Sequence, residues 1–179
     1  MGEIWDLYDK NKKLIGKKHE RGKRLNIGEY HLVVAVWIVN DNGQILITRR
    51  HPDKVYGSLW EVTGGAVQSG EDSITGAKRE LFEETGIDCG DDKLFLLGTL
   101  VKRDWIVDIY ILKKNILIDK LKLQKEEVTD AKWVSIAEFE QMCSKNLIAP
   151  FTVNDFNLYR DKILQHMNRT CFTQKDYSE

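Results

Sequence analysis

The sequence predicts an α/β protein in which helices cover both faces of a mixed β-sheet, giving an α/β/α sandwich. Three observations support this fold class. Residues 31–39 form an unbroken apolar run rich in β-branched side chains, short enough to be a central strand buried on both faces. Helical periodicity begins near residues 69–72, and a second amphipathic pattern covers 155–167. Strands mixed with helices in this order are typical of a layered sheet.

The remaining elements are expected on both sides of the central strand. Strands are expected at residues 4–15 (two short strands around a turn at 9–11), 44–49, 58–63, 93–101, 105–112 and 131–134. Residues 16–29 are polar and punctuated by glycine, which predicts a loop. Ser69 and Asp72 have capping-box spacing, and Gly86 stands where a helix end favours glycine. A further helix is expected over 135–145.

Length and composition predict one ordinary globular domain. The chain has 179 residues, 42% of them hydrophobic and 31% charged, with no repeat or low-complexity linker. We predict a single domain over residues 1–168 with a core of about 29–145, followed by a polar, mobile tail at 169–179. The net charge of −1 gives no overall attraction for nucleic acid, so a nucleic-acid polymer is not an expected partner.

The sequence predicts a cytoplasmic protein with no membrane partner. The longest apolar run, residues 32–39, is about a third of a membrane span. The N-terminus lacks a basic region followed by an apolar stretch, so no signal peptide is expected. Cys89, Cys143 and Cys171 are far apart, which predicts neither a disulfide framework nor a zinc site.

Residues 65–87, GAVQSGEDSITGAKRELFEETGI, carry the most specific chemistry. On a helical wheel, the stripe that would pack on the sheet consists of Ile74, Ala77, Leu81 and Thr85. Glu80, Glu83 and Glu84 gather on a neighbouring face, where each like-charge pair costs about 0.2–0.5 kcal/mol. A divalent cation reverses this repulsion, because carboxylate oxygens suit Mg²⁺ or Mn²⁺. The alternative is a solvated acidic face with an Arg79–Glu83 ion pair.

The spacing outside the helix favours the functional interpretation. The segment matches the pattern G-x5-E-x7-R-E-U-x-E-E-x-G-U, where U is aliphatic, at every position. Chance odds for such a match in a chain of this length are on the order of 10⁻⁷. The matched residues are Gly65, Glu71, Arg79, Glu80, Leu81, Glu83, Glu84, Gly86 and Ile87. The segment resembles the Nudix box, which implies the Nudix fold and an enzyme that hydrolyses a diphosphate bond in a small phosphorylated metabolite.

The resemblance also implies roles for individual residues. The metal-binding positions of the family are matched by Gly64 (through its carbonyl), Glu80, Glu83 and Glu84. The Glu80 position is a metal ligand or a base, depending on the member, and Arg79 pairs with Glu71 to hold the loop against the helix. Mg²⁺ is the implied cofactor, with Mn²⁺ as the alternative, because a divalent ion neutralises the diphosphate and acts as a Lewis acid.

Other candidate site residues lie outside the box. Family members often take the general base from a later glutamate; Glu126 and Glu127 are the candidates, and a charged loop is the alternative. The predicted catalytic set is therefore Glu80, Glu83, Glu84, Arg79 and Glu127. The predicted substrate contacts are Arg49, Arg50 and Lys54. Arginine matches a phosphate bidentately, although these side chains could equally keep an edge strand soluble.

Two alternative functions stay open. Beyond the box, the resemblance extends to residues 6–9, 28–33 and 59–60, which are similar to the Nudix branch related to isopentenyl diphosphate isomerase. That enzyme moves a double bond and requires a cysteine shortly after the tryptophan matching Trp60, whereas residues 61–67 contain none. His31 matches a metal-binding histidine of the isomerases but lacks its partners, which favours a core role. A non-catalytic binding domain is disfavoured because every box carboxylate is kept.

The expected substrate is a nucleoside di- or triphosphate or a derivative, with isoprenoid and sugar diphosphates as alternatives. Trp60, Trp105 and Tyr110 are candidates for stacking on a base, with core packing as the other interpretation. Nudix proteins are often homodimers; the residues themselves do not predict an oligomeric state.

Overall fold

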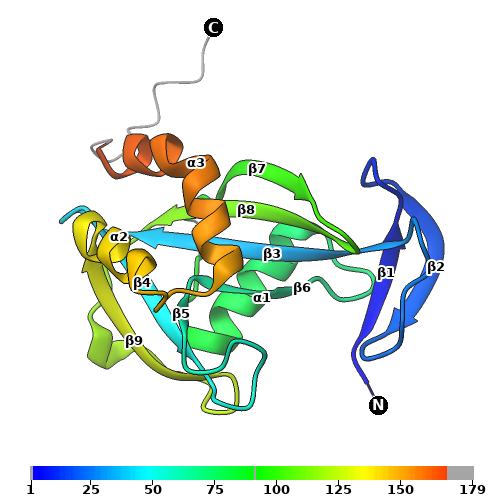
Figure 1. Ribbon diagram of the computed structural model, residues 1–179, viewed down its shortest axis with the longest axis horizontal. Helices are drawn as coiled ribbons and strands as arrows, with labels where there is room; N and C mark the ends of the chain where they lie inside the picture. Colours follow the sequence, from blue (N-terminus) through cyan, green and yellow to red (C-terminus); the bar gives the residue numbers. More distant parts are fainter. Residues whose placement is uncertain (1, 91, 169–179) are drawn as a thin grey trace, which may run out of the picture.

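The computed structural model describes residues 2–90 and 92–168 (Figure 1). The tail predicted at 169–179 lies outside these described residues. The strands are β1 (Ile4–Tyr8), β2 (Leu14–Glu20), β3 (Tyr30–Val39), β4 (Gln44–Arg50), β5 (Trp60–Glu61), β6 (Thr63–Ala66), β7 (Phe95–Val101), β8 (Trp105–Lys113) and β9 (Val128–Ser135). The helices are α1 (Ser73–Thr85), α2 (Ile136–Ser144) and α3 (Pro150–Asn168), with a 3-10 turn η1 (Ile118–Lys120).

The central position of β3 confirms the α/β fold with a mixed sheet. It pairs in parallel with β8 and antiparallel with β1, β4 and β6. Its even-numbered residues, such as Val36, share a core cluster with Leu81 of α1. Trp37 shares the opposite cluster with Phe139 of α2 and Phe156 of α3. The apolar run therefore alternates between two covered faces, as a central strand of a layered sheet requires.

Helix α1 begins later than the capping-box spacing predicted. Its N-cap is Asp72, whose side chain accepts the Thr75 N–H at 2.8 Å, while the Ser69 hydroxyl donates to Asp6. Gly86 ends the helix in the left-handed region with φ of 73°, as expected. The predicted packing stripe is correct except for Ile74, which is 39% exposed. Ile74 lies in the first turn, before the core cluster reaches the helix at Ala77.

Several other boundaries differ from the prediction. Residues 16–20, expected in a loop, continue β2, because this strand lies at the sheet edge where polar side chains face water. The strand expected at 58–63 is two short strands, since β5 pairs with β4 and β6 with β3. Ser58 also has a left-handed φ of 66° and is not extended. Helix α3 starts earlier, at Pro150, because proline fits the first turn of a helix.

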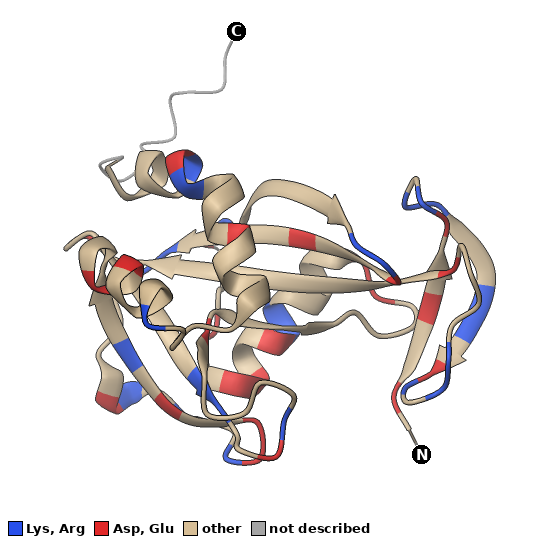
Figure 2. Cartoon of the chain, in the orientation of Figure 1, with Lys and Arg blue, Asp and Glu red and all other residues tan. Residues whose placement is uncertain are grey.

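The elements place charge unevenly around the fold. In Figure 2, basic positions are seen along β2 of the N-terminal hairpin, and acidic positions mark α1 at the centre of the molecule.

None of the helices within residues 2–90 and 92–168 has the length and apolar character needed to cross a membrane.

Candidate active site

A cavity of about 1040 Å³ lies beside the odd-numbered face of β3. Its walls come from α1, β6, β8, the N-terminal hairpin, the loop between β4 and β5, and the start of α3. The predicted site residues that line it are Arg50, Lys54, Gly64, Arg79, Glu80, Glu83, Glu84 and Glu127. Arg49 is not among the lining residues; it is exposed, and its Nε donates to the Ser58 carbonyl at 3.0 Å. The fold thus gathers most of the predicted set at one cavity.

Glu84 is the most unusual carboxylate of this cavity. It is 3% exposed, and its Oε2 is buried without a hydrogen-bond partner. Burial raises the pKa of Glu84 well above its ordinary value, and the nearby Glu61 carboxylate adds to that rise. Lys54 opposes the rise without cancelling it. A buried acceptor with no donor is costly, so this end of the cavity is suited to a cation.

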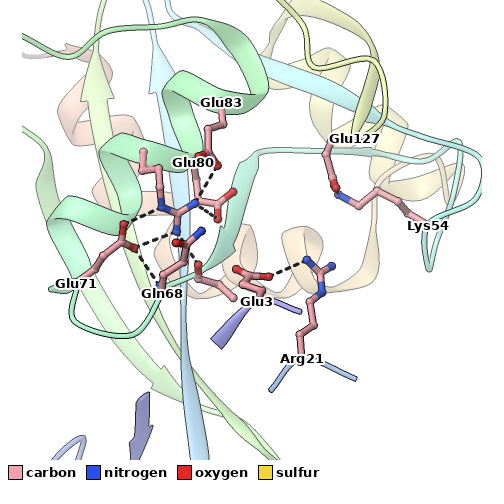
Figure 3. A network of polar contacts seen from close by, with 10 residues as sticks. Glu3, Arg21, Lys54, Gln68, Glu71, Glu80, Glu83 and Glu127 are labelled. Atoms are coloured by element: carbon pink, nitrogen blue, oxygen red, sulfur yellow. Dashed lines mark hydrogen bonds and ion pairs between the residues drawn. The ribbon is translucent and has the colours of Figure 1, made fainter. Parts of the chain in front are cut away.

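Arg79 organises three further glutamates, Glu71, Glu80 and Glu83, which are labelled close together in Figure 3. Its guanidinium donates to both oxygens of Glu71, at 2.8 and 3.0 Å, and to the Ala66 carbonyl at 2.9 Å. The same group donates to Glu80 at 2.8 Å and to Glu83 at 2.9 Å. Burial raises the pKa of Glu80, although Arg79 opposes that rise. One arginine therefore ties the loop before α1 to two of the candidate metal ligands.

Two glycines of β6 allow the chain to approach this helix face. A Cβ on Gly65 would lie 2.3 Å from Cδ of Glu80, so only glycine leaves room for that carboxylate. A Cβ on Gly64 would lie 2.3 Å from the Val34 carbonyl oxygen of β3. The side-chain carboxylate of Glu80 therefore lies against bare backbone at Gly65.

Glu61 is a site residue that the sequence reasoning missed. It is buried on β5, and its carboxylate pairs with Arg50 at 2.5 Å. Burial raises the pKa of Glu61, with Arg50 opposing the effect. The available signal was an acidic residue flanked by Trp60 and Val62 inside a predicted strand, where a charge needs a partner.

Two of the three basic residues predicted to contact phosphate, Arg50 and Lys54, line the cavity and are already paired with carboxylates. Arg50 pairs with Glu61 and lies over the ring of Phe151, at 5.5 Å from its centroid. Lys54 forms an ion pair with Glu127, visible at the right of Figure 3. Each cation therefore stands beside a carboxylate that a phosphate oxygen could replace.

The donor set fits a hard divalent cation. All the candidate ligands offer oxygen, which Mg²⁺ and Mn²⁺ prefer, and Glu84 Oε2 is an acceptor that lacks a donor. Within the part of the chain that the structure describes, no three metal-ligating side chains form a ready-made cluster. Arg79 instead engages an oxygen each of Glu80 and Glu83.

Comparison with known proteins agrees with this geometry. Residues 29–160 match the family model described as NUDIX domain. An uncharacterised Nudix hydrolase of Listeria monocytogenes is 38% identical over 156 residues, which cover 83% of this chain and 89% of the relative. An isopentenyl-diphosphate Delta-isomerase of Pectobacterium atrosepticum is 27% identical over 143 residues, or 75% of this chain and 78% of that protein.

Solved structures share the fold at lower sequence identity. The crystal structure of DR0079 from Deinococcus radiodurans has a TM-score of 0.71 at 20% identity, covering 93% of this chain and all of that one. A bifunctional NMN adenylyltransferase/ADP ribose pyrophosphatase from Francisella tularensis, complexed with AMP and a manganese ion, has a TM-score of 0.58 at 18% identity. That match covers 75% of this chain and 42% of the Francisella chain.

Proposed function

Since the chain belongs to the NUDIX domain family and is a hydrolase, we propose that it cleaves a diphosphate bond in a nucleoside di- or triphosphate or a derivative, with Mg²⁺ held beside Glu84. The observation that carries this proposal is the enclosed, unpartnered Oε2 of Glu84 in a cavity that is also lined by Arg50 and Lys54, each paired with a carboxylate. A carboxylate-rich end next to phosphate-binding groups suits a metal-assisted reaction on a dianionic or trianionic substrate.

Four groups would hold the ion: the side chains of Glu80, Glu83 and Glu84 and the carbonyl of Gly64. When bound, Mg²⁺ supplies charge neutralisation and Lewis acidity to the diphosphate, and Mn²⁺ would serve in the same way. Arg79 keeps Glu80 and Glu83 in register with the loop, because its guanidinium fork binds both of them and the loop together.

The substrate is expected to exchange the ion pairs at the other side of the cavity. A phosphate oxygen displaces Glu61 from Arg50 and Glu127 from Lys54, so the two cations hold the diphosphate. Glu127, freed from Lys54, then accepts the proton of a water molecule that attacks phosphorus, while the bridging oxygen leaves with the departing phosphate. Glu80 is the alternative base, since burial raises its pKa and makes it a better proton acceptor.

Two further observations support the nucleoside part of the proposal. The Francisella tularensis protein, of which the match covers 42%, was solved with AMP and a manganese ion, and this supports a nucleotide substrate and a divalent ion. The volume of the cavity, about 1040 Å³, allows a substrate larger than a bare diphosphate.

The test is release of phosphate or pyrophosphate with Mg²⁺ from a panel of nucleoside di- and triphosphates, dinucleotides, sugar nucleotides and isopentenyl diphosphate. Glu84→Gln is the blank, and Glu126→Gln is the matched control, because Glu126 is exposed and does not line the cavity. Release that requires Mg²⁺, persists in Glu126→Gln and disappears in Glu84→Gln is the expected result. Release that persists in Glu84→Gln contradicts the metal assignment, and isomerisation of isopentenyl diphosphate without release contradicts the reaction.

A further inference from the structure

Aromatic rings form a row across four neighbouring strands at the end of the cavity near the N-terminal hairpin. The row consists of His19 (β2), Trp5 (β1), His31 (β3) and Trp105 (β8). The rings of Trp5 and His31 are stacked, with centroids 4.2 Å apart and planes 14° from parallel. His19 stacks more loosely on Trp5, with centroids 6.1 Å apart. Trp5, His31 and Trp105 line the cavity, and His19 does not.

This row lies at a defined distance from the acidic end of the cavity, where Glu84 and Gly64 lie. His31, Val33 and Ala35 point to the same face of β3 and all line the cavity. Ala35 is the register partner of Gly64, a candidate metal ligand. His31 and Ala35 are four positions apart on an extended strand, which spans about 13 Å. A diphosphate at the acidic end and a ring at the aromatic row would therefore be joined across an apolar floor, with room for a sugar between them.

The unpartnered polar atoms of the row restrict which chemical groups can bind beside it. The Trp5 indole Nε1 and the His31 Nδ1 are both buried without a hydrogen-bond partner. An indole N–H can only donate, so whatever satisfies it must present an acceptor. A nucleobase edge carries acceptors and donors together with a flat face for stacking. An isoprenyl chain has neither and would leave both atoms unsatisfied, which is costly.

The charges beside the row favour an uncharged ring. Burial lowers the pKa of His31 to about 4, so its imidazole is neutral at physiological pH. Arg21 pairs with Glu3 at 2.9 Å, as Figure 3 shows, and Lys102 lies 3.7 Å from Asp155. Arg21 and Lys102 are thus paired with carboxylates, whereas Asp104, which lies close enough to His31 to oppose the fall in its pKa, has a buried Oδ1 without a hydrogen-bond partner.

We propose that Trp5 and His31, with Trp105 beside them, bind the nucleobase of the substrate and so select nucleoside diphosphate compounds over isoprenoid ones. The proposal rests on the proposed function for the position of the diphosphate, and it adds the residues that recognise the remainder of the substrate. The N-terminal hairpin is then part of the specificity site, since it contributes Trp5.

The experiment measures binding without metal and without a cleavable bond, so that a failure of hydrolysis does not decide it. The full-length chain is titrated in EDTA with the four common nucleoside 5′-monophosphates and with ribose 5-phosphate, which lacks a base. At least one nucleotide is expected to bind about tenfold more tightly than ribose 5-phosphate, because stacking a base on an aromatic side chain contributes affinity of that order. The NMR resonance of the Trp5 indole N–H should shift with that nucleotide.

Matched histidine variants separate recognition from general packing. His31→Leu and Trp5→Leu should each weaken binding of the preferred nucleotide by about tenfold. His19→Leu, which removes the other ring stacked on Trp5 but lies outside the cavity, should change it by less than about twofold. Trp5→Phe keeps an aromatic ring but removes the indole N–H. It should bind the preferred nucleotide more weakly and no longer distinguish nucleotides through a hydrogen bond from that N–H.

Three results would overturn the proposal. They are equal binding of ribose 5-phosphate and every nucleotide, an indole resonance of Trp5 that does not respond, or equal losses in His19→Leu and His31→Leu. Loss of hydrolysis with nucleotide binding intact would instead count against the proposed function and leave this site standing.

Discussion

The replacement Glu84→Gln separates a metal ligand from a structural glutamate. Glu84 is enclosed on α1, and burial together with Glu61 raises its pKa. At neutral pH the ionised form of Glu84 therefore opposes folding. Burial and the nearby carboxylates disfavour its charge, and no hydrogen bond to Oε2 offsets this cost. Glutamine has nearly the same shape without the charge, so the metal-free variant should be at least as stable as the wild type, by roughly 0–2 kcal/mol.

The sign of the stability difference between the wild type and Glu84→Gln reverses when Mg²⁺ is present. An ion at about 100 times its dissociation constant stabilises the folded chain by ~2.7 kcal/mol. For a chain of this size that corresponds to a rise in Tm of roughly 5–10 °C, which the wild type should show and Glu84→Gln should not. Activity should fall by about 10²–10³-fold, because a metal ligand contributes several kcal/mol to transition-state stabilisation.

The assay is thermal unfolding of both proteins in EDTA and in millimolar Mg²⁺, together with phosphate release. Glu126→Gln is the control for the same chemical change at an exposed glutamate outside the cavity. A variant that is much less stable than wild type in EDTA would show that Glu84 is a structural residue. An equal Mg²⁺-dependent rise in Tm for both proteins would refute its role as a ligand.

The remaining predictions address the neighbours of Glu84 and the acid response of the fold. Gly65→Ala should displace the Glu80 carboxylate, because the new Cβ would lie 2.3 Å from Cδ of Glu80. This variant should lower kcat by about tenfold or more while Tm changes by only a few degrees. An unchanged kcat would exclude Glu80 from catalysis. Glu127→Gln should reduce kcat by about 10²-fold, whereas Glu126→Gln should not. Equal kcat values for Glu127→Gln and the wild type would leave Glu80 as the base. The pKa of His31 falls from 6.5 to about 4 on folding, so the unfolded chain binds more protons below pH 6.5. Stability contributed by this residue is complete above pH 6.5 and is lost as the pH falls towards 4, by up to about 3 kcal/mol, and His31→Leu should flatten that part of a urea-unfolding series. An identical slope in the variant would show that His31 does not titrate in this way.

Local sequence patterns were enough to predict the layers of the fold. The β-branched run at 31–39 identified β3, and Gly86 marked the end of α1. Boundaries that depend on partners were less accessible. The polar residues of β2 are a strand because β1 offers an edge to pair with, and residues 58–63 divide because β5 and β6 find different neighbours. Neither pairing is visible in a window of sequence.

The candidate site shows the same division. Motif spacing was sufficient to select Glu80, Glu83 and Glu84, and the cavity contains all three. Spacing could not show that Glu84 is enclosed while Glu83 has a side chain 46% exposed, because both lie next to each other on one helix. Glu61 and the aromatic row have no motif, since their members come from separate strands and meet only through sheet register.

The most direct test of the central claim follows the phosphorus atoms of the substrate by ³¹P NMR, with the full chain, with and without Mg²⁺. The account predicts that the diphosphate resonances of a nucleoside di- or triphosphate disappear and monophosphate or pyrophosphate resonances replace them, only when Mg²⁺ is present. Diphosphate resonances that stay intact across the substrate panel, with isopentenyl diphosphate isomerised or a nucleotide merely bound, would contradict it.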